Sequence, residues 1–514
     1  MIAHVSTFTL AGLEPHRVTV EVDLRGGLPT FTIVGLGDRA VRESRERVRA
    51  AIQNSGFQFP ASRVTVNLAP ASLRKSGPGF DLAIACGVLA ASGQIPTERL
   101  ERLAVFGELA LGGAIRPGRG VLAVAEGVRD AGLEGLIVAT ERVGEAALVG
   151  TITVHGAGSL PEAAAVLRGQ PVEDAAHVAR GPATEEGDVT DAMAAAPPDL
   201  ADIRGHAAVL GALTIAAAGG HNLLLTGPPG TGKTMLARRL PGILPPLTAA
   251  EALEVTRIQS IVGLRGGGSL LTERPFRAPH HHISASGLVG GGAVPMPGEA
   301  TLAHHGVLFL DELSEFARDA LEALRQPLED GRVAIVRGQR TAIFPTRLML
   351  VAATNPCPCG YLGAERCRCS EPELIRHRRR LSGPLLDRID LQVHVERPSA
   401  EELRGAAHCT TAGERERVTA ARERQLERLK GTRATCNAHM DAAQVRLLVT
   451  LADDAEAELW RDYDRGGLSA RGHQRVLRVA RTIADLDASR DVSRSHVLHA
   501  LGLRRDGDSV AASA

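Results

Sequence analysis

A glycine-rich segment ending in Lys-Thr has the residue types and spacing that bind the phosphates of a nucleotide. Its residues are Gly227, Pro228, Pro229, Gly230, Thr231, Gly232, Lys233 and Thr234. In such a loop the backbone N–H groups face the β-phosphate, the lysine ammonium reaches the β- and γ-phosphate oxygens, and the threonine hydroxyl binds Mg²⁺. The positive end of the helix that begins at the lysine adds to this attraction. The segment therefore predicts binding and hydrolysis of a nucleoside triphosphate with Mg²⁺.

The elements that would hold this loop are also visible in the sequence. An apolar run, Leu223 to Leu225, predicts a strand before it, and Met235 to Leu240 predicts a helix after it. A Gly/Pro-rich turn without phosphate chemistry is the alternative, but such a turn does not require a strand and a helix on its two sides. Only three of the 59 basic residues are lysines, so Lys233 indicates a site that needs a compact ammonium.

Two further strand patterns end in polar residues that suit the same chemistry. The apolar run Val307 to Leu310 precedes Asp311, which is expected to hold Mg²⁺ through water, and Glu312, which is expected to polarise the attacking water. A third buried-strand pattern, Leu348 to Ala353, precedes Asn355, whose amide can touch the γ-phosphate and position water. The sequence therefore predicts a complete hydrolytic site.

Two later segments each carry an arginine: Leu385 to Asp390 contains Arg388, and Ser469 to Gly472 contains Arg471. With the motifs above, they resemble the AAA+ family and its magnesium-chelatase and MCM-helicase branch. The resemblance implies that ATP is the nucleotide and Asn355 is sensor 1. It also implies that Arg388 is an arginine finger for the neighbouring subunit and Arg471 is sensor 2, a surface salt bridge being the alternative for either. A finger acting in trans implies a ring, expected to be a homo-hexamer.

The resemblance extends over nearly the whole chain. Asp199 to His206 resembles the segment that covers adenine, which implies a nucleotide contact at Ile203, although glutamine is usual where this chain has His206. Three N-terminal segments, Phe31 to Leu36, Val41 to Ala50 and Gly107 to Gly113, are similar to the ComM/YifB group of magnesium-chelatase-like ATPases. Members of that group are bacterial hexameric motors implicated in branch migration of DNA during natural transformation. The resemblance implies a DNA-stimulated ATPase with helicase or branch-migration activity.

The N-terminal region also resembles the proteolytic domain of Lon. The active-site loop of Lon runs Lys-Asp-Gly-Pro-Ser, whereas this chain has Lys75-Ser-Gly-Pro-Gly79 and so lacks the nucleophile. The position of the catalytic lysine falls at Leu122, and Ser76 lies three residues too early to substitute. The resemblance implies a Lon-like scaffold or DNA-facing module without protease activity.

A chain of 514 residues is expected to form two or three domains. Alternating strand and helix patterns predict a Lon-like α/β domain over residues 1–168. An acidic stretch rich in Ala, Gly and Pro predicts a flexible linker over 169–198. The AAA+ α/β core is expected over 199–398 and a C-terminal helical lid over 399–514.

Two segments of the core are candidates for DNA contact. The first is a glycine-rich insertion from Pro279 to Pro295, which contains the histidine triplet His280 to His282 and is followed by the histidine pair His304-His305. For these histidines, polar pore lining or local capping is favoured over metal binding. The second is a hairpin from Arg332 to Arg347, for which an ordinary exposed turn is the alternative. The basic run from Arg376 to Arg380 suits phosphates or a subunit interface.

Four of the seven cysteines form a cluster, Cys357, Cys359, Cys367 and Cys369. In a cytoplasmic protein such clustering favours metal over disulfides, so Zn²⁺ is a candidate cofactor. Reduced free thiols in a flexible loop are the alternative, because the Cys-x-Cys spacing is tighter than the usual Cys-x-x-Cys.

The overall composition constrains the partners. Formal net charge is zero, so DNA binding must come from local basic patches, and with aromatics at 3% base stacking is not expected to dominate. The sequence shows neither a long apolar run nor a signal-peptide pattern, which predicts a cytoplasmic protein without membrane association. Two other functions stay open: the motor subunit of a chelatase that inserts Mg²⁺ or Co²⁺ into a tetrapyrrole, and a remodeller of proteins.

Overall fold

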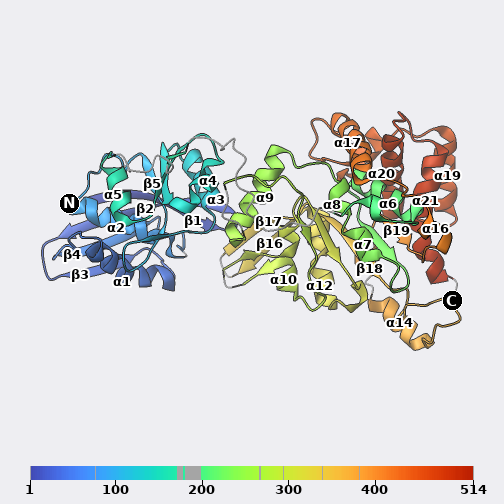
Figure 1. Ribbon diagram of the computed structural model, residues 1–514, viewed down its shortest axis with the longest axis horizontal. Coiled ribbons are helices and arrows are strands. Elements are labelled where there is room, and N and C mark those ends of the chain that lie inside the picture. The colour runs from blue at the N-terminus through green and yellow to red at the C-terminus, as the bar shows by residue number, and fades with distance from the viewer. Residues whose placement is uncertain are drawn as a thin grey trace. The chain divides into compact units, whose positions relative to one another are not determined.

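The computed structural model describes residues 2–75, 77–170, 178–179, 198–264, 268–292, 294–337, 340–380 and 383–512. The chain forms two compact units (Figure 1). The first comprises Met1–Thr190 with Ala252–Leu271, and the second comprises Asp191–Glu251 with Thr272–Ala514. Residues 252–271, expected in the AAA+ core, thus belong to the N-terminal unit. Most of the predicted 169–198 linker lies outside the described residues, but strand β10 (Val178–Ala179) pairs with β9 (Thr153–Ala157).

Among its described residues the first unit has a mixed sheet in the order β10-β9-β8-β5-β1-β2-β4-β3. The remaining strands are β1 (Ile2–Ala11), β2 (Glu14–Arg25), β3 (Thr30–Val34), β4 (Arg63–Ala69), β5 (Leu103–Val105) and β8 (Gly135–Ala139), with a small hairpin of β6 (Glu108–Leu109) and β7 (Ile115–Arg116). Alternating residues of β4 are buried, as expected for a strand with one face on a core.

The helices of the first unit are α1 (Arg39–Asn54), α2 (Asp81–Ala91), α3 (Val121–Asp130), α4 (Val143–Ala147), α5 (Leu160–Leu167) and most of α9 (Ala249–Val262). Helix α2 is apolar on all sides and every one of its residues is buried, because it packs against β1, β2 and α1. Its only charged residue, Asp81, accepts hydrogen bonds from Arg47 Nε at 2.7 Å and from the Ser44 hydroxyl. Ser44 and Arg47, both in the segment similar to ComM/YifB proteins, therefore stabilise this domain's core.

The second unit is built on a parallel sheet in the order β12-β15-β18-β11-β19. Its strands are β11 (Leu223–Thr226), β12 (Phe276–Arg277), β15 (Val307–Leu310), β18 (Met349–Thr354) and β19 (Leu391–His394). The strands β15 and β18 are buried along their whole length, which explains their unbroken apolar sequence. Because the strands are parallel, their carboxyl ends meet at one edge, and the polar residues predicted for the site follow three of them.

Asn222 joins three neighbouring strands, β18, β11 and β19, at their opposite, amino-terminal ends. Its side-chain oxygen accepts from Leu350 N at 2.8 Å, its side-chain nitrogen donates to Arg388 O at 2.9 Å, and its own N–H donates to Asp390 Oδ2 at 3.1 Å. This residue therefore fixes the register of β11 between β18 and β19.

Helices cover both faces of this sheet, and those after residue 399 share its core. They are α6 (Ala207–Gly219), α7 (Lys233–Ala237), α8 (Leu240–Ile243), α10 (Ala285–Val289), α11 (Glu299–Leu302), α12 (Arg318–Ala323), α13 (Arg325–Asp330), α14 (Glu371–Arg380), α15 (Gly383–Leu386), α16 (Ala400–Arg404), α17 (Thr411–Arg428), α18 (Ala442–Leu448), α19 (Asp453–Asp464), α20 (Ala470–Leu486) and α21 (Arg494–Ala512). Helices α17 and α20 pack on α6, with α21 against β19 (Figure 1). The region after residue 399 is helical, and its role as a lid stays a prediction. In the part of the chain that is described, no helix is long and apolar enough to cross a membrane.

Candidate nucleotide-binding site

The glycine-rich loop connects β11 to α7, as the sequence predicts. Gly227 passes so close to the carbonyl of Val395, after β19, that a side chain at this position would collide with it. Gly232 has a φ of +86° and ends the loop immediately before Lys233, the first residue of α7. The loop is thereby held against the carboxyl edge of the sheet with a helix N-terminus behind it, the arrangement that binds phosphate.

Lys233 and Asn355 meet within this loop. The Lys233 ammonium donates to Gly227 O at 2.7 Å, to Pro228 O at 2.8 Å and to Asn355 Oδ1 at 3.2 Å. Burial lowers the pKa of Lys233, and the nearby Asp311 carboxylate opposes that shift. Asn355 directly follows β18, the strand beside β11, so parallel pairing brings the predicted sensor to Lys233, the lysine predicted to bind phosphate.

Thr234 and Asp311 form the second contact of the site. The Thr234 hydroxyl donates to Asp311 Oδ2 at 2.6 Å. Glu312 follows with a φ of +52°, and its carboxylate oxygen Oε2 lies 3.4 Å from His281 Nδ1. Hydroxyl and carboxylate oxygens are ligands that Mg²⁺ prefers, so Thr234 and Asp311 are placed to share one ion.

Arg388 lies at the other end of the sheet from this loop. Its carbonyl binds Asn222, the residue before β11, whereas the phosphate loop follows β11. Four residues of strand separate the two ends, or about 13 Å at roughly 3.3 Å per residue. The guanidinium is buried and forms an ion pair with Glu329 on α13. The structure therefore does not bring Arg388 to the ATP site of its own chain.

The remaining predicted nucleotide contacts differ in their surroundings. Ile203 is buried in the core of the second unit. His206 is half-buried and lies beside the phosphate loop, with its Nε2 4.0 Å from the position that a Cβ on Gly232 would take. Burial lowers the pKa of His206, and the nearby Glu402 carboxylate opposes that shift. Arg471 is exposed in the first turn of α20 and makes no hydrogen bond or ion pair with the described residues. The roles of Ile203 and Arg471 thus stay predictions.

The two candidate DNA segments are both hairpins, and they touch. In the insertion, α10 leads into β13 (Gly290–Gly291), which pairs with β14 (Met296–Pro297). The second hairpin is confirmed: β16 (Arg332–Arg337) pairs with β17 (Arg340–Pro345), and the tip, Gly338 and Gln339, lies outside the described residues. A Cβ on Gly290 would lie 2.8 Å from Ile335 Cδ1, so one hairpin rests on the other.

The histidines of this region have distinct roles. His304 is buried, and its Nδ1 accepts a hydrogen bond from Arg347 N at 3.0 Å, a local cap as one interpretation of the sequence predicted. The rings of His280, His281 and His282 lie close together in tilted and edge-on arrangements, with centroids 4.1 to 5.0 Å apart. Sequence analysis did not indicate that His281 would reach Glu312, because Glu312 lies 31 residues later in the chain, two positions after the end of β15.

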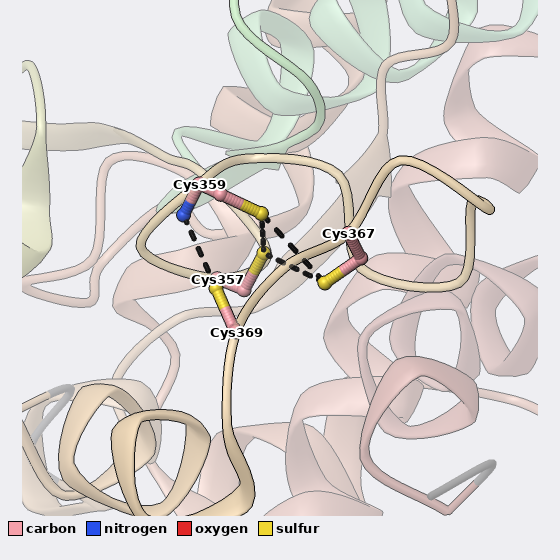
Figure 2. Close-up of side chains that lie close together, drawn as sticks. All are labelled: Cys357, Cys359, Cys367 and Cys369. Carbon is pink, nitrogen blue, oxygen red and sulfur yellow. Dashed lines mark hydrogen bonds between the residues drawn. The ribbon is translucent and has the colours of Figure 1, made fainter.

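The four clustered cysteines come together in the loop between β18 and α14 (Figure 2). The Cys357 sulfur lies 3.4 Å from that of Cys359 and 4.0 Å from that of Cys367. The Cys359 and Cys367 sulfurs are 3.6 Å apart, and Cys369 Sγ accepts a hydrogen bond from Cys359 N at 3.4 Å. All four sulfurs lie within 4.8 Å of one another.

The basic run predicted from the sequence forms the end of α14. Arg376 and its neighbours Arg378 and Arg379 are exposed, but His377 is buried and its Nε2 donates to Asn355 O at 3.0 Å. Sequence analysis assigned this run to phosphates or an interface and missed the contact of His377 with the sensor strand. The available signal was that His377 is the one histidine among four arginines.

Family models cover most of the chain. One described as magnesium chelatase, subunit ChlI, matches residues 199–403. A second, subunit ChlI of Mg-chelatase, matches 20–142, and a third, the ChlI C-terminal region, matches 409–504. The chain is 42% identical over 508 residues to the uncharacterised protein YifB of Salmonella typhimurium, covering 98% of this chain and 97% of the relative.

The chain belongs to the ComM/YifB family of magnesium-chelatase-like AAA+ proteins. Another member, the competence protein ComM of Haemophilus influenzae, is 42% identical over 496 residues, which are 96% of this chain and 95% of the relative. The chain is also similar, more weakly, to RuvB of Mycobacterium leprae, a Holliday junction branch migration complex subunit. The two are 28% identical over 184 residues, which are 36% of this chain and 39% of RuvB. For this member of the ComM/YifB family, the α/β core with its parallel sheet is that of an AAA+ ATPase, which uses ATP and Mg²⁺.

Proposed function

We propose that this protein is a ring-forming motor, expected to be a homo-hexamer, that hydrolyses ATP to move along DNA and drive branch migration. In this proposal Lys233 and Thr234 bind the phosphates and Mg²⁺, Asp311 holds the ion, and Glu312 activates water. Asn355 positions that water. The convergence of Lys233, Asn355, Thr234 and Asp311 on one edge of the sheet supports the hydrolytic half of the proposal.

The observation that carries the DNA half is the contact between the two hairpins. One face of β16–β17 is buried through Val333, Ile335 and Phe344, which seats the hairpin firmly on the protein. Arg332 on its other face and Arg337 at the end of β16, next to the tip, are exposed to solvent. A rigidly packed hairpin with exposed arginines, next to a glycine-rich loop, can contact the phosphates of a moving DNA backbone. Such contacts do not depend on the base sequence.

The position of Arg388 supports a shared active site. The Arg388 backbone lies at the amino ends of the strands, which are about 13 Å long, and its guanidinium pairs with Glu329, so we propose that it acts on the nucleotide of a second subunit. In a ring, the amino-terminal edge of one sheet can face the nucleotide of its neighbour. Arg388 would then stabilise charge on the transferred phosphoryl group, and Arg471 would act from α20.

The relatives point to the same substrate. ComM is named as a competence protein and RuvB as a subunit of a Holliday junction branch migration complex. Carried over to this chain, those names favour branched DNA during recombination or natural transformation, within the cytoplasm. The RuvB match, though partial, comes from a protein whose stated substrate is the same kind of junction.

We propose that the Lon-like first unit is not a protease. The position of the nucleophile holds Gly79, where a Cβ would lie 2.6 Å from the Phe106 ring, so no side chain fits there. The position of the catalytic lysine holds the fully buried Leu122. Lys75 is buried and donates to the Pro70 carbonyl. A scaffolding or DNA-facing role is proposed, and the absence of ATP-dependent casein cleavage would support it.

A second function is favoured by the family models, which take their descriptions from magnesium chelatase. In that case the protein would be the motor subunit that drives insertion of Mg²⁺ or Co²⁺ into a tetrapyrrole. The same site would hydrolyse ATP, but the two hairpins would have no nucleic acid to bind. Metal insertion into a porphyrin by a lysate supplemented with this protein would favour the chelatase.

The deciding experiment is steady-state ATP hydrolysis without DNA and with single-stranded, duplex or four-way-junction DNA. Stimulation greatest with the junction, lost in Arg388→Ala, is the expected result. The affinity should fall with salt, with a log–log slope of about −0.9 for each phosphate contacted. Turnover indifferent to every DNA, together with no DNA binding at low salt, would overturn the proposal.

A further inference from the structure

We propose that Cys357, Cys359, Cys367 and Cys369 bind one Zn²⁺ ion, which fixes the loop after β18 against the nucleotide-binding site. The site and its role lie outside the proposed DNA function and do not depend on it. Zn²⁺ bound by four thiolates is tetrahedral, with Zn–S distances of about 2.3 Å, which corresponds to sulfurs about 3.8 Å apart.

The arrangement of the sulfurs fits such an ion. The sulfurs of Cys357, Cys359 and Cys367 are 3.4, 3.6 and 4.0 Å apart in pairs, and all four sulfurs lie within 4.8 Å of one another (Figure 2). The cysteines are free, and these separations are far longer than the roughly 2.05 Å of a disulfide. The Cys359 N–H donates to Cys369 Sγ at 3.4 Å, as backbone donors do around thiolate ligands. One ion at the centre of the four sulfurs satisfies all of them.

The loop has few other means of keeping its shape. Its residues from Gly363 to Arg366 are exposed. Its local contacts include two turn hydrogen bonds of 2.9 Å, from Gly360 N to Cys357 O and from Cys367 N to Ala364 O. The Arg366 guanidinium also lies 3.8 Å from the centre of the Tyr361 ring. Because so little apolar surface is buried, a metal cross-link supplies the stability that a core would give elsewhere.

The loop touches the nucleotide machinery at two points. A Cβ on Gly360 would lie 2.5 Å from Pro229 Cδ, so the cysteine loop packs directly on the phosphate-binding loop. Two residues before Cys357 is Asn355, whose carbonyl accepts from His377 on α14, the helix that begins two residues after Cys369. Zn²⁺ would tie both ends of the loop together and so position Asn355 beside Lys233.

Metal content of the full-length protein, measured by elemental analysis, tests the assignment. About one zinc per chain is expected in the wild type and in the controls Cys409→Ser and His281→Ala, which alter a cysteine and a histidine outside the cluster. Cys369→Ser should retain less than about a tenth of it, whereas Cys369→His should keep the ion, because Cys₃His is also a zinc ligand set. A mercurial added to folded wild-type protein should release the zinc, so the test does not depend on every variant folding.

The positioning role has its own readout. In Cys369→Ser, kcat for ATP hydrolysis should fall at least tenfold while nucleotide affinity stays within about threefold, and Cys369→His should restore kcat. The assignment would be overturned if the wild type contained no zinc, or contained iron with visible absorbance instead. Zinc retained in Cys369→Ser, or lost from His281→Ala, would overturn it as well. Wild-type kcat in zinc-free Cys369→Ser would overturn the positioning role.

Discussion

The Thr234 hydroxyl and the Asp311 carboxylate are 2.6 Å apart, and this hydrogen bond joins the first turn of α7 to the end of β15. The two residues are 77 positions apart in the chain, so the fold, rather than local sequence, creates this pair of oxygen ligands. Mg²⁺ placed between the phosphates and these oxygens would be held by the Thr234 hydroxyl oxygen, which keeps its proton, and by the Asp311 carboxylate, in place of the hydrogen bond between them.

Removing the charge of Asp311 should therefore stop hydrolysis while leaving the fold intact. Asp311→Asn keeps the shape and still accepts from Thr234, but it offers Mg²⁺ a neutral oxygen, so ATP turnover should fall by about 10²–10³-fold. Thr234→Ser keeps the hydroxyl and should stay within a few fold of the wild type. Retention of half the wild-type turnover by Asp311→Asn would contradict this role.

Mixing two inactive variants should restore activity if the arginine acts across subunits. Arg388→Ala should lower turnover by about 10³-fold, yet Glu329, its half-exposed partner, can be solvated when left alone. Lys233→Ala destroys the phosphate site but keeps Arg388. Mixed rings contain Arg388→Ala sites served by a Lys233→Ala neighbour, so they should hydrolyse ATP. Activity no greater than the sum of the separate variants would argue against a trans role.

His281→Ala should raise hydrolysis in the absence of DNA. The imidazole Nδ1 lies 3.4 Å from Glu312 Oε2 and restrains the carboxylate proposed to activate water. A severalfold rise in basal turnover, with a smaller further rise on adding DNA, is expected in a steady-state assay. Glu312→Gln in the same background is the control and should abolish the increase. A fall in basal turnover in His281→Ala would assign the histidine a supporting role instead.

Arg337→Ala should weaken DNA binding in a salt-dependent way. Arg337 is exposed at the end of β16, next to the hairpin tip, and a single phosphate contact contributes about one unit to the slope of log affinity against log salt. The slope measured by fluorescence anisotropy should shrink by about one. Arg318→Ala removes an exposed arginine of α12 that pairs with Glu322 and should leave the slope unchanged. Equal slopes for Arg337→Ala and the wild type would exclude this contact.

Cys86 should resist alkylation. Burial in α2 raises the pKa of its thiol to about 12 from an ordinary 9.0, so near pH 8 its thiolate fraction is roughly 10³-fold lower than that of a free cysteine. Because the thiolate is the reactive form and pH 8 lies below both values, labelling should rise with pH and show no plateau up to pH 10. Peptide mass spectrometry after iodoacetamide treatment should show the half-buried Cys409 labelled well before Cys86. Equal rates for the two would contradict the assigned burial.

Local pattern sufficed for the elements that carry the site. The run Val307 to Leu310 is apolar because β15 is buried on both faces, and the loop before Lys233 begins with glycine because Gly227 passes against the carbonyl of Val395. Contacts between distant segments were out of reach. The residues around Glu312 do not predict its contact with His281, and those around Pro229 do not predict its contact with Gly360. Both contacts depend on how distant strands and loops pack together.

The assignment of residues 252–271 could not be read from the sequence for a related reason. The buried side chains of α9, among them Val255 and Ile258, show that one side of the helix is covered, but periodicity does not say by what. In the structure Arg257 Nη1 lies 3.3 Å from Glu126 Oε2, and the Ser260 hydroxyl donates to Glu145, which place this segment in the first unit.

That placement makes the two units inseparable by a single cut. A truncated chain that starts at Asp199 would lose the sheet of the first unit but keep residues 252–271, with Ile261 and its neighbours stripped of their cover. Such a chain would expose apolar surface and tend to aggregate. Any minimal ATPase fragment must therefore either retain the whole N-terminal region or replace 252–271 with a short polar bridge. In the same way, gene fusions that exchange the first unit between relatives would have to exchange both pieces together.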